Sequence, residues 1–268
     1  MVAVITNQET GAHYYMDGYL HANLSTAKSV MEKDWDMVFL VDGMEGAGKS
    51  VFAQQIGYFI DPTLCLDRIV FTPEDFRKAI LSAEKKQCVI YDEAYAGLSS
   101  RGTMSKINRL IIKMLTEIRR RNLFIIIVLP SIFILDKYVA IWRSRALVHV
   151  YTGAAFERGY FSFYNLDTKK ELYMNGIKLY SYAYPRPNFH GRFYNHYLVD
   201  AEAYKNKKDV DTQKMMDDGD AKKLQDIVDT KAKIAYNLRT VGMTHIEIGK
   251  VMGCTRQTVY NLLKEVEP

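Results

Sequence analysis

Short apolar runs alternate with segments of helical spacing over the first half of the chain. Continuous apolar, β-branched runs are typical of strands buried on both faces of a parallel sheet, whereas apolar positions three and four residues apart predict helices. The runs predict strands over Met37–Val41, Arg68–Phe71, Cys88–Tyr91, Leu123–Leu129 and Arg145–Tyr151, and helices over Lys49–Ile60, Thr72–Lys85 and Ser105–Arg121. This order predicts an α/β fold with a mostly parallel sheet flanked by helices.

The pattern changes in the aromatic stretch that follows. Tyr160–Tyr164 is strand-like, and Asn175-Gly176 lies between two short apolar segments, Glu171–Met174 and Ile177–Tyr182. Asn-Gly flanked in this way predicts a two-residue hairpin turn. We therefore expect a small antiparallel β meander appended to the sheet. We expect its aromatic side chains to pack on the core or on a neighbouring subunit. The interleaved Lys and Arg residues make stacking on single-stranded DNA the alternative.

The C-terminal third is more polar. Ala201–Asp229 is rich in Lys and Asp, which is typical of a linker or an exposed helix, and the last forty or so residues regain helical periodicity. These shifts predict an N-terminal extension (1–35), an α/β core (36–155), the aromatic β meander (156–200), a polar linker (201–228) and a helical module (229–268).

Composition narrows the class of protein. The 268 residues are 48% hydrophobic and 25% charged, which excludes a collagen-like or largely disordered chain. Three scattered cysteines argue against a disulfide framework and a structural zinc site, so we expect a reducing, cytoplasmic setting. No apolar run reaches the ~18 residues of a membrane helix, and the N-terminus lacks signal-peptide features. The net charge of +5 slightly favours an anionic partner such as nucleic acid.

Gly43–Ser50 fits the phosphate-loop pattern G-x-x-x-x-G-K-S/T at every fixed position, between a predicted strand and a predicted helix. Glycines let backbone N–H groups converge on phosphate oxygens, and the helix start adds a partial positive charge. Lys49 is expected to reach the β- and γ-phosphates, and the Ser50 hydroxyl to ligate Mg²⁺. The predicted nucleotide-binding residues are Gly43, Glu45, Gly46, Ala47, Gly48, Lys49, Ser50 and Val51.

Two carboxylates follow the strand Cys88–Tyr91. In a parallel sheet the carboxyl ends of the strands line the ligand crevice, so Asp92 is placed to hold Mg²⁺, directly or through water. Glu93 is then expected to polarise the attacking water. A strand ending in an acidic helix cap is the alternative interpretation of this pair.

The loop, the acidic pair and the strand Leu123–Leu129 together resemble the additional-strand, catalytic-glutamate division of P-loop ATPases, over roughly Asp36 to Tyr151. No guanine-reading N-K-x-D sequence occurs, which favours ATP over GTP. Within that division, the chain resembles the HerA/FtsK group and most of all the zonular-occludens-toxin (Zot)-like ATPases of phages and mobile elements. The stretches that carry this resemblance are Tyr91–Ala94, Arg119–Asn122, Ile125–Leu129, Leu135-Asp136 and Arg143–Arg145.

The resemblance implies a DNA-pumping or DNA-export motor that forms a ring, with a hexamer favoured. A ring ATPase needs a cation from a neighbouring subunit at the γ-phosphate, and we expect Arg143, or failing that Arg145, to supply it. The Arg119–Arg121 triplet is an alternative that favourable capping of a helix C-terminus explains equally well. The family commonly has a polar γ-phosphate sensor after the strand Leu123–Leu129, and Ser131 is the candidate here.

The last residues predict a helix-turn-helix, and this end resembles resolvase-type DNA-binding modules. Lys231–Thr240 and Thr244–Met252 have helical spacing, Gly253 makes the turn, and Thr255 caps a third helix. Arg, Gln and Asn can read base edges, and Lys and Thr suit phosphates. The predicted DNA-binding residues are Thr255, Arg256, Gln257, Thr258, Tyr260, Asn261 and Lys264. A small helical bundle for protein contact is the alternative.

These features favour an Mg²⁺-dependent ATPase that acts on DNA as a homo-oligomeric motor in packaging, transfer or replication. A DNA-binding regulator or loader that ATP switches, without motor activity, contains the same motifs. A small-molecule kinase with an accessory domain is a third hypothesis, against which the acidic pair and the helix-turn-helix argue.

Overall fold

The computed structural model describes residues 2–6, 11, 13–92, 101–117 and 121–264 of the chain. The chain divides into two compact units, Met1–Thr212 and Gln213–Pro268. In the part of the chain that is described, no helix is both long and apolar enough to cross a bilayer.

Among the described residues, seven strands of the first unit form one mostly parallel sheet in the order β4-β5-β6-β3-β7-β8-β9. β8 and β9 pair antiparallel at one edge, and the other five strands are parallel. The strands are β3 (Met37–Gly43), β4 (Ile69–Val70), β5 (Cys88–Tyr91), β6 (Phe124–Leu129), β7 (Ala146–Tyr151), β8 (Tyr160–Tyr164) and β9 (Phe189–Arg192). The predicted α/β sheet is thus confirmed, and β6 lies between β3 and β5.

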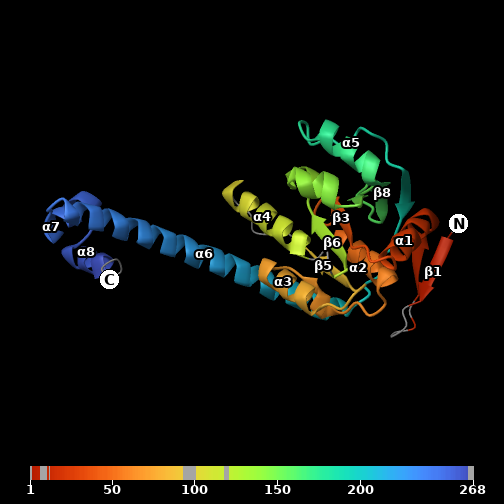
Figure 1. Ribbon diagram of the computed structural model, residues 1–268, viewed down its shortest axis with the longest axis horizontal. Coiled ribbons are helices and arrows are strands. Elements are labelled where there is room, and N and C mark those ends of the chain that lie inside the picture. The colour runs from red at the N-terminus through yellow and green to blue at the C-terminus, as the bar shows by residue number, and fades with distance from the viewer. Residues whose placement is uncertain (1, 7–10, 12, 93–100, 118–120, 265–268) are drawn as a thin grey trace. The chain divides into compact units, whose positions relative to one another are not determined.

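Both faces of the sheet are covered by helices, which explains why its central strands β5 and β6 are continuously apolar. Phe39 and Val41 face the core shared with α1 and α2, whereas Val38 and Leu40 face the core shared with α3, α4 and α5. Figure 1 shows the central strands between α2 on one side and α4 on the other. The helices of this unit are α1 (Gly18–Met31), α2 (Lys49–Ile60), α3 (Pro73–Ser82), α4 (Arg101–Glu117) and α5 (Leu166–Gly176), with short 3₁₀ turns at Leu66–Arg68 and Ile132–Ile134 and a π-helix at Tyr138–Arg143.

The N-terminal segment, predicted as an extension, packs on this core. β1 (Val2–Thr6) and β2 (His13–Asp17) form a two-stranded antiparallel sheet, and Asp17 caps α1 by accepting from the N–H groups of Tyr19 and Leu20. One face of α1 is buried in the same core as α2. Its buried residues are three or four positions apart, as expected of a helix: Leu20, Leu24, Ala27 and Met31.

The hairpin predicted around Asn175-Gly176 is wrong, because this stretch is the end of helix α5. Asn165 caps that helix by accepting from two backbone N–H groups, and the buried positions Lys169, Leu172, Tyr173 and Gly176 have a helical period. A Cβ at Gly176 would lie 2.6 Å from the Phe133 ring, so the glycine serves close packing and not a hairpin turn. The antiparallel part of the fold is therefore an edge of the main sheet.

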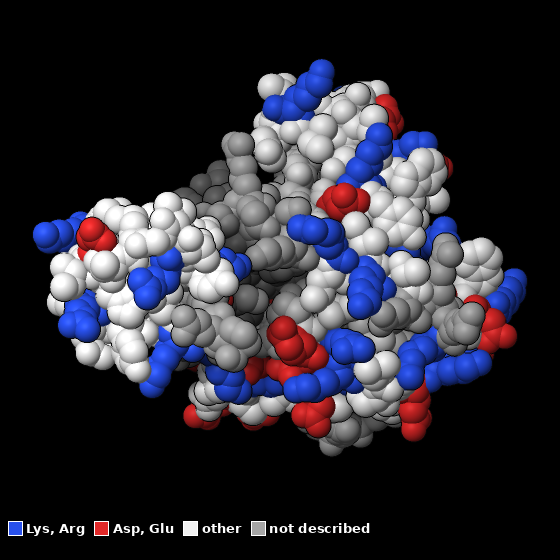
Figure 2. All heavy atoms as spheres, turned by 60° about the vertical axis from the view of Figure 1, so that its left-hand side comes forward, with Lys and Arg blue, Asp and Glu red and all other residues white. Residues whose placement is uncertain are grey.

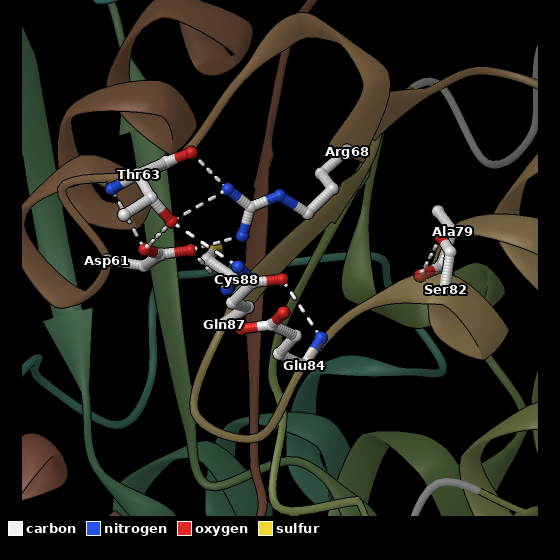
Figure 3. Close-up of polar contacts among 8 residues, drawn as sticks. All are labelled: Asp61, Thr63, Arg68, Ala79, Ser82, Glu84, Gln87 and Cys88. Atoms are coloured by element: carbon white, nitrogen blue, oxygen red, sulfur yellow. Dashed lines mark hydrogen bonds and ion pairs between the residues drawn. The ribbon is translucent and has the colours of Figure 1, made fainter.

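A buried polar cluster around Asp61 joins the end of α2 to the 3₁₀ turn before β4 and to the start of β5 (Figure 3). The Arg68 guanidinium donates to Asp61 Oδ2 at 2.5 Å, and the same oxygen accepts from the Cys88 N–H at 2.9 Å. Thr63 donates to the other Asp61 oxygen through its N–H and its hydroxyl. Breaking a buried pair of this kind costs about 3–5 kcal/mol, so Asp61 stabilises the connection opposite the phosphate loop.

The polar stretch from Ala201 is a helix, the second of the two forms that its composition allowed. α6 (Ala201–Thr240), α7 (His245–Met252) and α8 (Arg256–Lys264) follow one another. The turn between α7 and α8 has Gly253 at φ 63°, a left-handed conformation that suits glycine. The small apolar core of the second unit consists of Ala232, Ala235, Ile248, Val259, Leu262 and Leu263.

Candidate functional site

The phosphate-loop sequence lies at the carboxyl end of β3 and leads directly into α2. Gly43 has φ 137°, and a Cβ there would lie 1.9 Å from the carbonyl oxygen of Val150 on β7, so only glycine fits. Gly48 has φ 101° and caps α2 without a side chain, which exposes the first N–H groups of the helix. The Lys49 ammonium donates to the Met44 carbonyl at 2.8 Å and so lies over the loop.

A cavity of about 760 Å³ opens beside this loop. Lys49, Ser50 and Asp92 all line it, although they come from two different βα connections. Other predicted nucleotide-binding residues that line the cavity are Glu45, Gly46, Gly48 and Val51, whereas Ala47 is buried. Glu93 lies outside the described residues. The sheet order explains the convergence, because the parallel strands β3, β6 and β5 all end at the same edge.

The donor set suits magnesium. Asp92 offers a carboxylate and Ser50 a hydroxyl, the hard oxygen ligands that Mg²⁺ prefers in company with phosphate oxygens and water. Within the described ranges, no group of three or more His, Cys, Asp or Glu side chains forms a metal cage. A magnesium ion at Asp92 and Ser50 would complete its coordination with phosphate oxygens and water molecules.

Tyr204, at the first turns of α6, contacts Asp92. Its hydroxyl donates to Asp92 Oδ2 at 2.5 Å, and both side chains are almost completely buried. The Tyr204 ring packs against Phe71 and Tyr197 at centroid distances of 5.6 and 5.7 Å. This contact could not be predicted from the sequence, because 112 positions separate the two residues and no local spacing relates them.

The start of α6 is anchored around this contact. Lys207 donates to the carbonyl oxygens of Leu66 and Ile69, each at 2.8 Å, and burial lowers the pKa of its ammonium group. Lys205 and Lys208 line the same cavity as Lys49. The first turns of the stretch that composition marked as a linker are therefore part of the site.

An aromatic wall closes another side of the cavity. Phe193 stacks on Phe52 of α2 at 4.2 Å, and its ring lies 3.2 Å from the position that a Cβ would take at Gly48. Gln55 of α2 donates to the carbonyls of Tyr194 and His196 at 2.7 and 3.0 Å and so fixes the segment after β9. The aromatic residues of this part of the chain thus pack on the core, as expected, and also line the site.

Ser131, the candidate γ-phosphate sensor, is engaged elsewhere. Its hydroxyl lies 2.9 Å from the Tyr182 hydroxyl, and Pro130 lines the cavity in its place. Tyr182 in turn donates to the fully buried Asp42 at 2.5 Å, and Asp42 also contacts His149 Nδ1 at 2.8 Å. Burial, followed by the Asp42 charge, raises the pKa of Tyr182. Ser131 therefore belongs to a buried network behind the loop.

The structure does not bring the expected arginines to the cavity. Arg143 is 5% exposed, and its guanidinium pairs with Asp36 and donates to the Leu115 carbonyl at 3.1 Å. Arg145 lies over the Trp35 ring, 5.4 Å from its centroid. Both arginines precede β7, at the end of the sheet opposite the phosphate loop. The Arg143 guanidinium is thus engaged within its own chain, which argues against the role predicted for it at a neighbouring subunit; Arg119 and Arg120 lie outside the described residues.

In the second unit, the apolar positions of α8 are buried and the predicted DNA-contacting positions are exposed. Thr244 and Glu247 form a reciprocal capping box at the start of α7, and the Thr255 hydroxyl accepts from the Thr258 N–H at 3.2 Å. The seven exposed positions are Thr255, Arg256, Gln257, Thr258, Tyr260, Asn261 and Lys264. On the face drawn in Figure 2, the described basic and acidic side chains are interspersed and do not gather into one patch.

The chain matches no protein-family model and no curated protein.

Proposed function

We propose that the protein is an Mg²⁺-dependent ATPase that acts on DNA as an oligomeric motor. The observation that carries this proposal is the convergence of Lys49, Ser50 and Asp92 on one cavity beside a loop built for phosphate. Lys49 would neutralise the β- and γ-phosphates, and Ser50 and Asp92 would hold the magnesium ion. When bound, that ion supplies charge neutralisation at the phosphates.

The order of the strands supports hydrolysis by an activated water. β6 separates β3 from β5, so Asp92, which follows β5, lies one strand away from the loop. A base next to Asp92 in the chain would activate the water molecule that attacks the terminal phosphate. We assign the base to Glu93, which follows Asp92 in the sequence.

The C-terminal helices support DNA as the partner. α7 and α8 are joined by a tight glycine turn, and α8 exposes Arg256, Gln257 and Asn261 on its outer side. Such side chains can read base edges in the major groove. A ring of subunits around DNA would make many weak contacts of this kind, which suits a motor.

Two substitutions test the ATPase. Lys49→Ala is expected to abolish ATP binding, because the cation that faces the phosphates is lost. Glu93→Gln is expected to keep ATP binding and lose hydrolysis, because an amide cannot accept the proton. Binding of a fluorescent ATP analogue and phosphate release with no DNA, single-stranded DNA and duplex DNA measure both. Lys78→Ala, which changes a well-exposed lysine of α3, is the control.

Parental hydrolysis by Glu93→Gln would show that another group is the base. Parental ATP binding by Lys49→Ala would remove the phosphate-loop assignment, and with it the ATPase.

A second function, an ATP-switched DNA-binding regulator, is favoured by one specific observation. The same helix, α6, supplies Tyr204 to the cavity and Ala232 and Ala235 to the core of the second unit. Nucleotide could therefore alter DNA binding without any movement along DNA. Displacement of a third strand from a DNA triplex during ATP hydrolysis distinguishes the two, since only a motor produces it.

A further inference from the structure

The connection between β7 and β8 brings an arginine to the phosphate loop. Arg158 lines the same cavity as Lys49, and its Nη2 lies 3.8 Å from the position that a Cβ would take at Gly46. Gly46 lies two positions after Met44, whose carbonyl oxygen accepts a hydrogen bond from the Lys49 ammonium. Arg158 and Lys49 therefore approach the part of the loop where a bound nucleotide has its β- and γ-phosphates.

This connection is held at both ends. Gly153 donates to the Glu157 carbonyl at 2.8 Å, which closes a tight turn just before Arg158. Gly159, just after it, has φ 100°, and its carbonyl accepts from Phe193, in the aromatic wall, at 2.8 Å. A Cβ at Gly159 would lie 2.4 Å from the Phe193 carbonyl oxygen, so the backbone position of Arg158 is closely defined.

Arg158 is exposed, and it lines the cavity. The ion pairs found among the described residues do not include it, in contrast to the buried pairs of Arg68 and Arg143. An arginine fork matches phosphate oxygens geometrically and holds its charge at every physiological pH. The chain thus presents an exposed guanidinium where an anionic ligand would lie.

We propose that Arg158 contacts the terminal phosphates of the nucleotide bound by its own chain and is a catalytic residue of the ATPase. The proposal rests on the ATPase function proposed above. Arg158 would supply, from the same chain, the positive charge that the sequence analysis assigned to Arg143 of a neighbouring subunit.

The reaction defines the role. Water attacks the γ-phosphorus, the bond to the β–γ bridging oxygen breaks, and ADP, inorganic phosphate and one proton are released. Negative charge shifts onto the bridging oxygen and the γ-phosphate oxygens in the transition state. The N–H groups of Arg158 donate to those oxygens and stabilise the charge as it develops.

Substitution of Arg158 in the full-length protein tests this role without relying on turnover alone. Arg158→Ala is expected to reduce the preference for a fluorescent ATP analogue over the ADP analogue roughly 10- to 100-fold, because a charge-assisted contact to the γ-phosphate is lost. Hydrolysis is expected to fall about 100-fold or more. Arg158→Lys should recover part of both, since it keeps the charge and loses the fork. Arg186→Ala, another exposed arginine that does not line the cavity, should behave as the parent.

A mixing experiment decides whose arginine acts. Arg158→Ala and Lys49→Ala proteins, mixed and shown to co-assemble, are expected to remain inactive, because every site with an intact Lys49 lacks its own Arg158. Recovered hydrolysis would overturn the in-chain assignment. Parental nucleotide preference and turnover in Arg158→Ala would overturn the proposal altogether, whereas a parent protein that binds no nucleotide would instead refute the ATPase function on which it rests.

Discussion

Tyr204→Phe isolates the contact between α6 and the candidate magnesium ligand. The substitution removes one hydroxyl, which donates to Asp92 Oδ2 at 2.5 Å, and leaves the ring against Phe71 and Tyr197. The apolar packing of this region therefore stays as it is. Any change in behaviour reports on the hydrogen bond and not on a cavity.

The magnitude follows from the burial of the acceptor. Asp92 is 1% exposed, so water does not replace the lost donor easily. A hydrogen bond to a charged group contributes about 1.5–3 kcal/mol, and we expect the free energy of unfolding of Tyr204→Phe to fall by that amount. If Tyr204 also orients Asp92 toward the metal, the apparent affinity for the ion in the presence of ATP should fall by about 10- to 100-fold, as it does for groups that support metal ligands.

Two measurements check these values. Urea unfolding gives the stability difference, and electron paramagnetic resonance of Mn²⁺, a substitute for Mg²⁺, gives metal binding with ATP present. Tyr197→Phe is the matched control, because it removes a hydroxyl from the same cavity lining without touching Asp92. We expect that control to stay within about 0.5 kcal/mol of the parent.

Equal stability of Tyr204→Phe and Tyr197→Phe would refute the reasoning about the buried carboxylate. A stability loss with unchanged Mn²⁺ binding would show instead that Tyr204 only anchors α6.

Two further predictions concern other parts of the chain. Burial, and less strongly the Arg145 charge, lowers the pKa of the buried Lys169 to about 7 from 10.5. Unfolding then takes up a proton between these values, so stability should rise with pH from about 7 toward 10.5, by up to about 1.4 kcal/mol per pH unit. Urea unfolding at several pH values should show this slope in the parent and a flatter one in Lys169→Met; equal slopes would contradict it. In the second unit, Arg256→Ala should cost about 1–3 kcal/mol of DNA binding in a sequence-dependent manner, whereas Lys264→Ala should weaken all duplexes alike and reduce the salt dependence. Titrations of specific and scrambled duplexes at two salt concentrations check this, and an Arg256→Ala loss that is equal on both duplexes would assign that residue to the phosphates.

The elements that local spacing defines were largely predictable. β5 has the predicted bounds, α2 begins at Lys49 after the glycine loop, and α7 and α8 lie on either side of Gly253. These features depend on residues within a few positions of one another, such as the Thr72 cap and the proline after it in α3. Period and capping therefore suffice for them.

The α5 region shows where local signals mislead. Asn175-Gly176 satisfies a hairpin pattern, yet Lys169, Leu172 and Tyr173 are buried on one helical face against the π-helix and α4 side of the sheet. Burial of that face outweighs the turn preference of two residues, because tertiary packing stabilises a helix more than its local propensity does.

The sequence by itself determined the phosphate-loop pattern, the acidic pair after β5 and the α/β character of the sheet, because each is a pattern of neighbouring residues with a direct physical meaning. Only the tertiary structure decided which distant side chains complete the site. It buries Arg143 against Asp36, directs Ser131 to Tyr182, and brings Tyr204 and Arg158 to the cavity. Contacts between residues so far apart depend on how strands are ordered and helices packed, and no spacing along the chain encodes that order.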